Sequence, residues 1–304
     1  MNRPRILVIR LSALGDFVLS FGPFAAIRAA HPDAEITLLT TKPFELMAKA
    51  SPWFDRVILD AKPRWWDLPA LWRLSQSLRG FDFVYDLQTS GRSSRYFRLA
   101  GRPKWSGIAQ GCSHPHANPA RDSMHSVERQ RDQLRFAGIT DFPKPDLSWL
   151  TSTELPPELP SRFALLVPGA APTRPAKRWP VQNFAEIAKI LAERGVTPVV
   201  IGGRDEFELG ASIHAACPSA IDFTGVTSLV QVFALAALAE LAIGNDTGPM
   251  HIAASTSCPC IVLFSADSDP SLTAPRGPSG EWPVVLREPV LADLPVARVA
   301  EALS

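Results

Sequence analysis

Short apolar runs alternate with helix-like stretches from the beginning of the chain. Residues 5–11 form a compact and mainly apolar run, which is typical of a buried parallel strand. Small residues follow at 12–16, and residues 17–30 then show helical spacing until His31-Pro32 ends the pattern. Residues 35–40 predict the next strand. This order predicts a βαβ unit, and such units build parallel sheets.

The same alternation continues to residue 137. We expect strands at residues 56–60 and 81–87 and helices at 68–78 and 125–137. Residues 101–122 are rich in Gly, Pro, His and Ser, which predicts a loop.

A proline-rich segment at residues 143–160 lacks periodicity and predicts a linker. The alternation then restarts, with expected strands at 163–167, 197–201, 220–223, 241–243 and 260–264 and helices at 181–194, 209–216, 229–239 and from 249 onward. The fold class that follows is α/β, with two Rossmann-like parallel-sheet domains, residues 1–150 and 151–304, facing across a cleft. Ligands of open parallel sheets bind at the carboxyl ends of the strands, so we expect the site there.

Composition agrees with two globular domains. The 304 residues suit two domains of about 150 residues each. No apolar run reaches the ~20 residues that a membrane span needs, and Arg10 and Asp16 interrupt the first apolar run too early for a signal peptide. Four cysteines without a paired framework indicate a reducing compartment. We therefore expect a cytoplasmic protein.

Charge is distributed unevenly between the two halves. Residues 1–150 hold 21 Lys and Arg against 14 acidic residues, whereas residues 151–304 hold 10 against 16. A basic first half suits an anionic partner or an anionic membrane surface, and random scatter of surface charge is the alternative. The net charge of only +1 argues against a general nucleic-acid binder.

The most informative polar stretch is Gly244 to His251, between an expected strand and an expected helix. Such a turn directs backbone N–H groups and the positive end of a helix dipole toward a ligand, which favours phosphate. Asp246 is placed to accept hydrogen bonds from ribose hydroxyls, and His251 falls on the first turn of the helix. Alternatively, Asp246 or Thr247 only caps the helix and His251 packs against the sheet.

Two more strand-to-helix loops carry candidate donor-binding groups. Thr173, Lys177 and Arg178 lie in a proline-stiffened loop and offer a hydroxyl and two cations. Fixed cations stabilise the charge that develops on a departing diphosphate; a solvated basic loop is the alternative. Glu206, in the turn at residues 202–206, either contacts a nucleoside or favours a helix N-terminus.

In the first half, Asp16 follows Gly15 at the tip of the first expected strand. Glycine lets the backbone approach a ligand closely. A carboxylate facing a cleft can act as general base for an acceptor hydroxyl, although an Asp in this position is also a common helix cap.

These features together resemble the lipopolysaccharide heptosyltransferases, the family 9 glycosyltransferases of GT-B architecture. The combination of Asp-Thr-Gly-x-x-His at residues 246–251 with Gly15-Asp16 is the specific part. The similar segments, spread over nearly the whole chain, are residues 10–16, 82–88, 125–129, 177–180, 202–206, 224–225 and 245–254.

The resemblance implies an inverting, metal-independent transfer of heptose from ADP-heptose to the inner core, the lipid A–Kdo part of lipopolysaccharide. It implies a donor site in the second domain and an acceptor site in the first. By the same resemblance Asp16 is the general base and Lys177 the cation on the donor phosphates. The other donor-binding residues that it implies are Thr173, Glu206, Asp246, Thr247, Gly248 and His251.

Acceptor residues do not transfer cleanly from the resemblance. Arg64, Arg92 and Arg95 lie near expected strand ends and are our candidates for gripping an anionic acceptor, with ordinary surface arginines as the alternative. Trp65 and Trp66 are either buried core residues or anchors at a membrane interface. An acceptor in a lipid leads us to expect peripheral contact with the inner leaflet of the inner membrane.

Two clusters invite a metal interpretation that we do not favour. Asp267-Ser-Asp269 matches a metal-binding motif of a different glycosyltransferase fold, and Cys112, His114 and His116 have no common zinc-site spacing. We expect no metal and no cofactor besides the ADP-sugar substrate. The alternative functions are a GT-B enzyme that transfers or epimerises another nucleotide sugar, and a non-enzymatic scaffold in envelope assembly.

Overall fold

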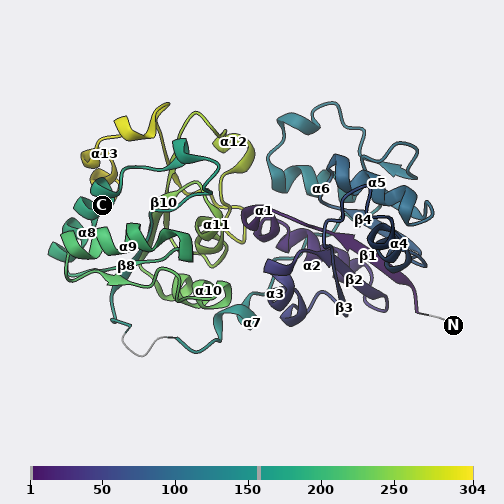
Figure 1. Ribbon diagram of the computed structural model, residues 1–304, viewed down its shortest axis with the longest axis horizontal. Helices are drawn as coiled ribbons and strands as arrows, with labels where there is room; N and C mark the ends of the chain where they lie inside the picture. The colour runs from purple at the N-terminus through teal and green to yellow at the C-terminus, as the bar shows by residue number, and fades with distance from the viewer. Residues whose placement is uncertain (1–2, 156–158, 304) are drawn as a thin grey trace. The chain divides into compact units, whose positions relative to one another are not determined.

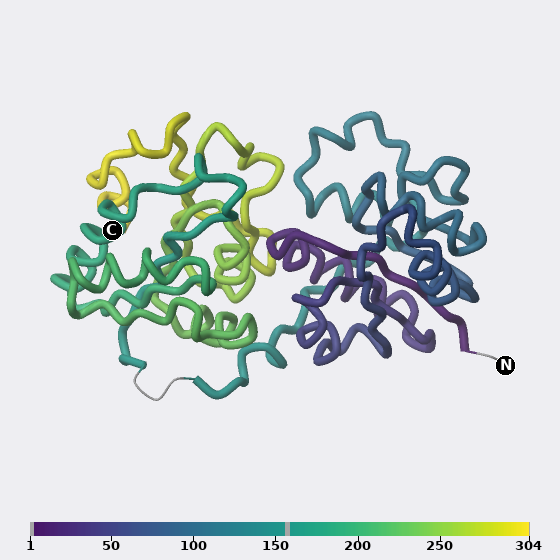
Figure 2. The backbone as a smooth tube through the Cα atoms, viewed as in Figure 1, coloured from purple at the N-terminus to yellow at the C-terminus, as the bar shows by residue number. Residues whose placement is uncertain are grey.

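The structure is a computed structural model that describes residues 3–155 and 159–303. The chain divides into two compact units, residues 1–145 and 146–304. Each unit has a six-stranded sheet in which the paired strands run parallel, with helices packed around it (Figure 1). Figure 2 follows the chain from one unit into the other, and the short helix α7 (Ser148–Thr151) lies within the expected linker. Residues 156–158 of that linker lie outside the described residues.

The sheet of the N-terminal unit has the order β3-β2-β1-β4-β5-β6. Its strands are β1 (Arg5–Ile9), β2 (Glu35–Thr40), β3 (Arg56–Leu59), β4 (Phe83–Asp86), β5 (Lys104–Gly107) and β6 (His114–Pro115). In the centre Leu7 of β1 pairs with Thr37 of β2 and Val84 of β4. These central strands are inaccessible to solvent on both faces, which explains their continuous apolar sequence.

Two predictions for this unit were wrong in detail. The helix expected over residues 17–30 is two helices, α1 (Leu14–Val18) and α2 (Phe21–Ala30), because the chain turns at Leu19–Ser20, where Ser20 Oγ bonds to the Asp16 carbonyl. The loop expected over residues 101–122 contains β5 and β6. These strands are short and contain no Val or Ile, so they are defined by pairing, β5 with β4 and β6 with β5, rather than by strand propensity.

The other helices of this unit cover the sheet. They are α3 (Glu45–Ala50), α4 (Leu68–Ser77), α5 (Gly91–Leu99) and α6 (Ser126–Phe136). Helix α2 contacts α6, and α4 contacts α5. The rings of Phe17, Phe24 and Phe44 pack together, with Phe17 stacked on Phe44 at a centroid distance of 4.7 Å. This aromatic cluster fixes α1, the helix that carries Asp16, against the rest of the unit.

The sheet of the C-terminal unit has the order β12-β11-β10-β7-β8-β9. Its strands are β7 (Phe163–Val167), β8 (Thr197–Val200), β9 (Ile221–Asp222), β10 (Leu241–Asn245), β11 (Cys260–Phe264) and β12 (Val284–Arg287). Its helices besides α7 are α8 (Val181–Glu193), α9 (Phe207–Ala216), α10 (Leu229–Leu238), α11 (Gly248–Ser255), α12 (Pro270–Thr273) and α13 (Val296–Glu301). Helix α8 packs with α9 and α13, whereas α10 packs with α7 and α11.

Both sheets contain a switch point, where strand order reverses. In the N-terminal unit β1 lies between β2 and β4, and in the C-terminal unit β7 lies between β8 and β10. Ligands of such sheets bind at the carboxyl ends of the strands beside this point. Asp16 follows β1, while Lys177 and Asp246 follow β7 and β10. Among residues 3–155 and 159–303, no helix has both the length and the apolar character of a membrane span.

Candidate active site

Lys177 and Asp246 form an ion pair at the switch point of the C-terminal unit. Lys177 Nζ lies 2.5 Å from Asp246 Oδ2, and both side chains are largely buried, with 13% and 7% of their surface exposed. Ser268 Oγ donates a second hydrogen bond to the same oxygen at 2.7 Å. His251 Nε2 lies 4.0 Å from the other carboxylate oxygen. Two loops and a helix therefore converge on one carboxylate.

Asn245, at the end of β10, holds the Lys177 loop in place. Its side-chain oxygen accepts the Trp179 backbone N–H at 3.1 Å, and its Nδ2 donates to the Pro168 carbonyl at 2.7 Å. Both ends of the loop are thus bonded to the strand that leads to Asp246. The indole of Trp179 is buried and donates to the Leu294 carbonyl. These contacts place Lys177 beside Asp246 although the two are 69 residues apart.

Helix α11 begins directly after Asp246. Thr247 has extended backbone angles, Gly248 starts the helix, and Pro249 occupies its first turn. The structure shows no side-chain cap on this helix, so neither Asp246 nor Thr247 has the capping role that was the alternative interpretation. The N–H groups of a first turn have no partner within the helix and attract anions. The arrangement can bind a phosphate group.

Glu206 occupies a niche beside the ends of β7 and β8 that two glycines create. Its Oε2 accepts the Gly203 N–H at 2.7 Å. A Cβ atom at Gly169 would lie 1.7 Å from Glu206 Oε1, and one at Gly202 would lie 2.6 Å from Oε2. Any side chain at either glycine would displace this carboxylate. Thr173 is exposed in the same loop as Lys177.

In the N-terminal unit, Asp16 uses both carboxylate oxygens. Oδ2 accepts the Ala13 N–H at 3.2 Å, which is a capping contact, while Oδ1 lies 3.1 Å from Arg10 Nη2. The side chain remains 40% exposed, so a ligand can reach it. Arg10 itself is buried and donates to the Leu87 carbonyl at 2.5 Å. A buried cation thus orients an accessible carboxylate.

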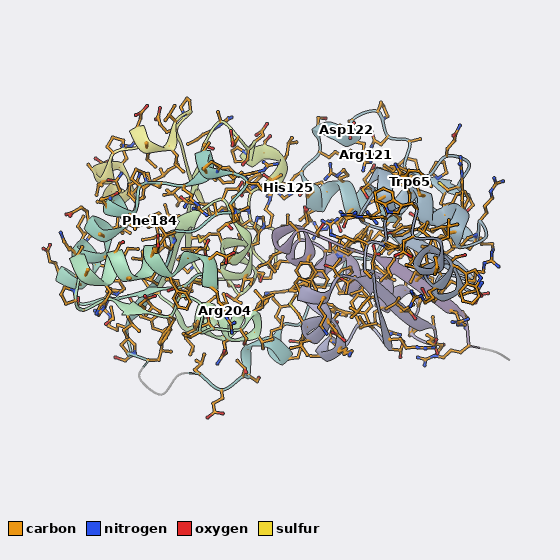
Figure 3. All side chains as sticks on the ribbon, in the orientation of Figure 1. Trp65, Arg121, Asp122, His125, Phe184 and Arg204 are labelled. Atoms are coloured by element: carbon orange, nitrogen blue, oxygen red, sulfur yellow. The ribbon has the colours of Figure 1, made fainter. Side chains whose placement is uncertain are left out.

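Arg121 and Arg129 complete this group, and the sequence interpretation missed both as site residues. Arg129 interacts electrostatically with Asp16 and Arg121, and burial lowers the pKa of Arg129, with Arg121 adding to the effect. Arg121 Nη2 donates to Thr89 Oγ1 at 2.7 Å, just beyond β4. Figure 3 labels Arg121 and His125 along the segment that leads into α6. The sequence offered one signal for Arg129, the segment at residues 125–129, but this segment was used only as part of the family resemblance.

The arginines named from the sequence lie elsewhere on the same unit. Arg64 is exposed and stacks over the Trp66 ring at 5.2 Å. Arg92 and Arg95 are exposed on α5, and Arg92 Nη1 donates to the Tyr96 hydroxyl at 3.4 Å. The structure instead places Arg10 and Arg129 near Asp16, and Arg121 near Arg129. The role of Arg64, Arg92 and Arg95 stays a prediction.

The two clusters considered for metals have other partners in the structure. Asp269 caps α12 by accepting the Ser271 N–H at 2.9 Å. His114 bonds to Ser113, His116 bonds to Asp132, and the Cys112 thiol donates to the Gly107 carbonyl. Within the part of the chain that the structure describes, no three His, Cys, Asp or Glu side chains are grouped to hold a metal ion.

Asp86, at the end of β4, is fully buried beside Arg10. Its Oδ1 accepts the Gln88 and Thr89 N–H groups at 3.1 and 3.0 Å, yet burial dominates and raises its pKa to about 7. A raised carboxyl pKa means that the folded state holds a proton that the unfolded state has lost. Folding stability from Asp86 is therefore lost as the pH rises from its ordinary pKa of 3.8 through about 7.

We expect Asp86→Asn to remove this pH dependence. Relative to the variant, the wild-type protein should lose about 2 to 3 kcal/mol of unfolding free energy between pH 5 and pH 8. Asn keeps the oxygen that accepts both N–H groups. Urea unfolding of the two proteins at several pH values measures the difference, and parallel curves would contradict the assignment.

Comparisons with known proteins identify the family of this chain. The model of glycosyltransferase family 9 (heptosyltransferase) matches residues 71–287. The lipopolysaccharide heptosyltransferase 2 of Salmonella typhimurium is 29% identical over 299 residues, covering 89% of this chain and 85% of that protein. The lipooligosaccharide heptosyltransferase 2 of Haemophilus ducreyi is 26% identical, covering 89% and 86%.

Solved structures share the fold. The family 9 glycosyltransferase of Veillonella parvula superposes with a TM-score of 0.81 at 21% identity, covering 100% of this chain and 97% of that one. The predicted fold class, two Rossmann-like parallel-sheet domains of GT-B type, is confirmed. Because the family model spans more than two thirds of the sequence, this chain belongs to glycosyltransferase family 9, the heptosyltransferase family.

Proposed function

We propose that this glycosyltransferase transfers heptose from ADP-heptose to the lipid A–Kdo inner core of lipopolysaccharide, with inversion at the anomeric carbon. The observation that carries the proposal is the Lys177–Asp246 pair at a switch point, next to the N-terminus of α11. Two similar curated relatives are named as heptosyltransferases of lipopolysaccharide or lipooligosaccharide. One similar solved structure is the Escherichia coli heptosyltransferase WaaC with ADP-2-deoxy-2-fluoro heptose, with a TM-score of 0.79 at 22% identity and 98% of both chains covered.

The C-terminal unit binds the donor in this proposal. The diphosphate lies against the first turn of α11, where Thr247 and Gly248 present backbone N–H groups. Lys177 and Thr173 contact the phosphates from the neighbouring loop. Asp246, whose carboxylate already accepts hydrogen bonds, takes hydroxyl groups of the ribose or the sugar. His251 borders this carboxylate.

Glu206 contributes to nucleoside binding. Its niche between Gly169 and Gly202 leaves a carboxylate at the ends of two strands beside the diphosphate loop. A carboxylate there can accept hydrogen bonds from ribose hydroxyls or from an amino group of the base.

The N-terminal unit supplies the base. Asp16 removes the proton from the acceptor hydroxyl as its oxygen attacks the anomeric carbon, and the bond to the ADP oxygen breaks on the opposite face. Lys177 and the α11 dipole stabilise the negative charge that accumulates on the departing diphosphate. In metal-dependent transferases a divalent cation stabilises the departing diphosphate. Here these fixed positive charges have that role, so the proposed reaction uses no metal.

The acceptor is anionic, and Arg10, Arg121 and Arg129 form the cationic surroundings of the base. We place a carboxylate or phosphate of the Kdo–lipid A acceptor at Arg121 and Arg129, since Arg10 is buried and bonded to Leu87. Because the acceptor is carried by a lipid, the enzyme works at the cytoplasmic face of the inner membrane.

We expect Arg129→Gln to raise the KM for the acceptor at least about tenfold, the value of one charge-assisted contact. The KM for ADP-heptose should stay unchanged. Arg135→Gln is the matched control, because Arg135 lies on the same helix but stacks on Phe142 at 5.2 Å. Steady-state kinetics with the concentrations of both substrates varied measure the two KM values. A change in the donor KM alone would contradict the assignment of Arg129 to the acceptor site.

The proposed function is tested with purified protein, ADP-heptose and de-acylated lipid A–Kdo in detergent-free buffer. We expect ADP release that depends on the acceptor, together with a product heavier by one heptose in mass spectrometry. Turnover of a different nucleotide sugar, or conversion of the nucleotide sugar to its epimer without an acceptor, would replace the proposal by the corresponding alternative. Nucleotide binding without any turnover would support the scaffold alternative.

A further inference from the structure

Four large apolar side chains on the N-terminal unit point into solvent. We call Trp65, Trp66, Leu68 and Trp72 the tryptophan patch. They are 74%, 56%, 70% and 64% exposed, respectively. Large exposed aromatic groups gathered in one place mark a surface that meets another molecule. Of the two interpretations of Trp65 and Trp66, burial in the core is therefore excluded.

The patch stands on a defined local structure. Asp67 caps α4 by accepting the Ala70 N–H at 3.1 Å. Leu68 and Trp72 are one turn apart and share a face of that helix. The Trp65 and Trp66 rings make an edge-to-face contact at 5.4 Å. Upstream, the buried Asp60 accepts the Lys62 N–H at 2.7 Å, which fixes the start of the segment.

The tryptophan patch does not belong to the hydrophobic core of the N-terminal unit. Leu74 and Leu78, at and just beyond the end of α4, already pack into the hydrophobic core of the N-terminal unit. The exposed face of α4 is thus separate from the face that holds the helix in the fold. Substitutions in the patch should leave folding intact.

Cations border the patch. Lys62, Arg64 and Arg73 are exposed around it, and Arg64 lies over the Trp66 ring. Asp67 is the one acidic residue between positions 61 and 73, and it is engaged as the helix cap. Tryptophan with basic neighbours is the composition that favours the headgroup region of a bilayer with anionic lipids.

The charge also argues against a second copy of the chain as the occupant. In a symmetric dimer the same patch would face itself, so the three cations of each copy would come together. Like charges brought together in an interface oppose association. An anionic lipid surface is complementary to the same residues.

We propose that the tryptophan patch, with Lys62, Arg64 and Arg73, is the surface by which this protein docks on an anionic phospholipid bilayer. The inference deepens the proposed function, since a lipid-borne acceptor lies in that bilayer, but the docking itself is measured without any transfer reaction. The indole rings enter the headgroup region, and the cations bind lipid phosphates.

The test is flotation of the full-length protein with two kinds of vesicle, one containing phosphatidylglycerol and one of phosphatidylcholine alone. Wild-type protein should float with the anionic vesicles and be released by high salt. Replacing Trp65, Trp66 and Trp72 by Ala should weaken partitioning more than tenfold. Changing Lys62 and Arg73 to Gln should weaken it about fivefold per cation, and mainly at low salt.

Trp282→Ala is the matched control. Trp282 is 53% exposed and also stacks with an arginine, Arg276, but it belongs to the C-terminal unit. This variant should float like the wild type. The triple tryptophan variant should keep the wild-type melting temperature and its rate with a de-acylated acceptor, while its rate with vesicle-embedded acceptor falls.

Three results would overturn the proposal. The first is flotation of the triple variant at the wild-type level, and the second is that Trp282→Ala loses as much flotation as the triple variant does. The third is a wild-type dimer in sedimentation that the triple variant abolishes. If the protein docks through the patch but does not transfer heptose, the docking surface stands and the proposed function fails.

Discussion

Replacing Asp16 by Asn is expected to slow heptosyl transfer roughly a thousandfold while ADP binding stays unchanged. General base catalysis by a positioned side chain contributes about a hundredfold to ten thousandfold, and Asn cannot accept a proton. ADP binding persists because the donor groups belong to the other unit in our assignment. The measurement pairs single-turnover transfer to a de-acylated acceptor with calorimetric titration of ADP.

The choice of Asn separates the base from the helix cap. An Asn oxygen can still accept the Ala13 N–H, and Asn caps helices as well as Asp does, so α1 should remain formed. Asp67→Asn is the matched control, since Asp67 is a helix cap in the same unit. That variant should transfer at the wild-type rate. Near-normal transfer by Asp16→Asn would leave Asp16 with capping as its role.

Asp16 illustrates what sequence can say about a site. Its place after Gly15 indicated a helix cap or a base, and the structure shows that one oxygen caps α1 while the other meets Arg10. A local sequence pattern can predict the capping contact, because its partner, Ala13, lies three residues from Asp16. The same pattern cannot predict Arg121 and Arg129, which belong to a segment more than a hundred residues downstream.

The central strands were predictable from the sequence, whereas β5, β6 and β12 were not. β1, β7 and β10 are buried on both faces and carry continuous apolar sequence. β5, with Lys-Trp-Ser-Gly, and the two-residue β6 have little strand propensity and exist through pairing. β12 was not anticipated either, because its exposed edge mixes Val with Arg. Strands of this kind depend on neighbours that a sequence window does not include.

The Lys177–Asp246 pair shows the same limit in the C-terminal unit. Each loop was a candidate from its own sequence, yet only the strand order, with β10 beside β7, joins them. Ser268 was missed for this reason. It lies in the segment considered as a metal motif, but its hydroxyl donates a hydrogen bond to Asp246.

Replacing Lys177 by Met is expected to lower kcat about a hundredfold to a thousandfold and to raise the KM for ADP-heptose. A fixed charge on the developing leaving group typically contributes this much. The same change leaves Asp246, only 7% exposed, without its cation, and we expect a loss of about 3 kcal/mol of folding stability in the absence of donor. Chemical unfolding and steady-state kinetics of one preparation give both quantities.

The double variant Lys177→Met with Asp246→Asn separates stability from catalysis. Removing the carboxylate charge should restore most of the lost stability, because no buried charge is left unpaired. Transfer should stay as slow as in Lys177→Met, or slower, since neither change returns a cation to the diphosphate. Lys189→Met is the matched control, because Lys189 pairs with Glu186 on the exposed face of α8 in the same unit. If the double variant recovers wild-type transfer, Lys177 acts only by neutralising Asp246 and has no direct contact with the donor.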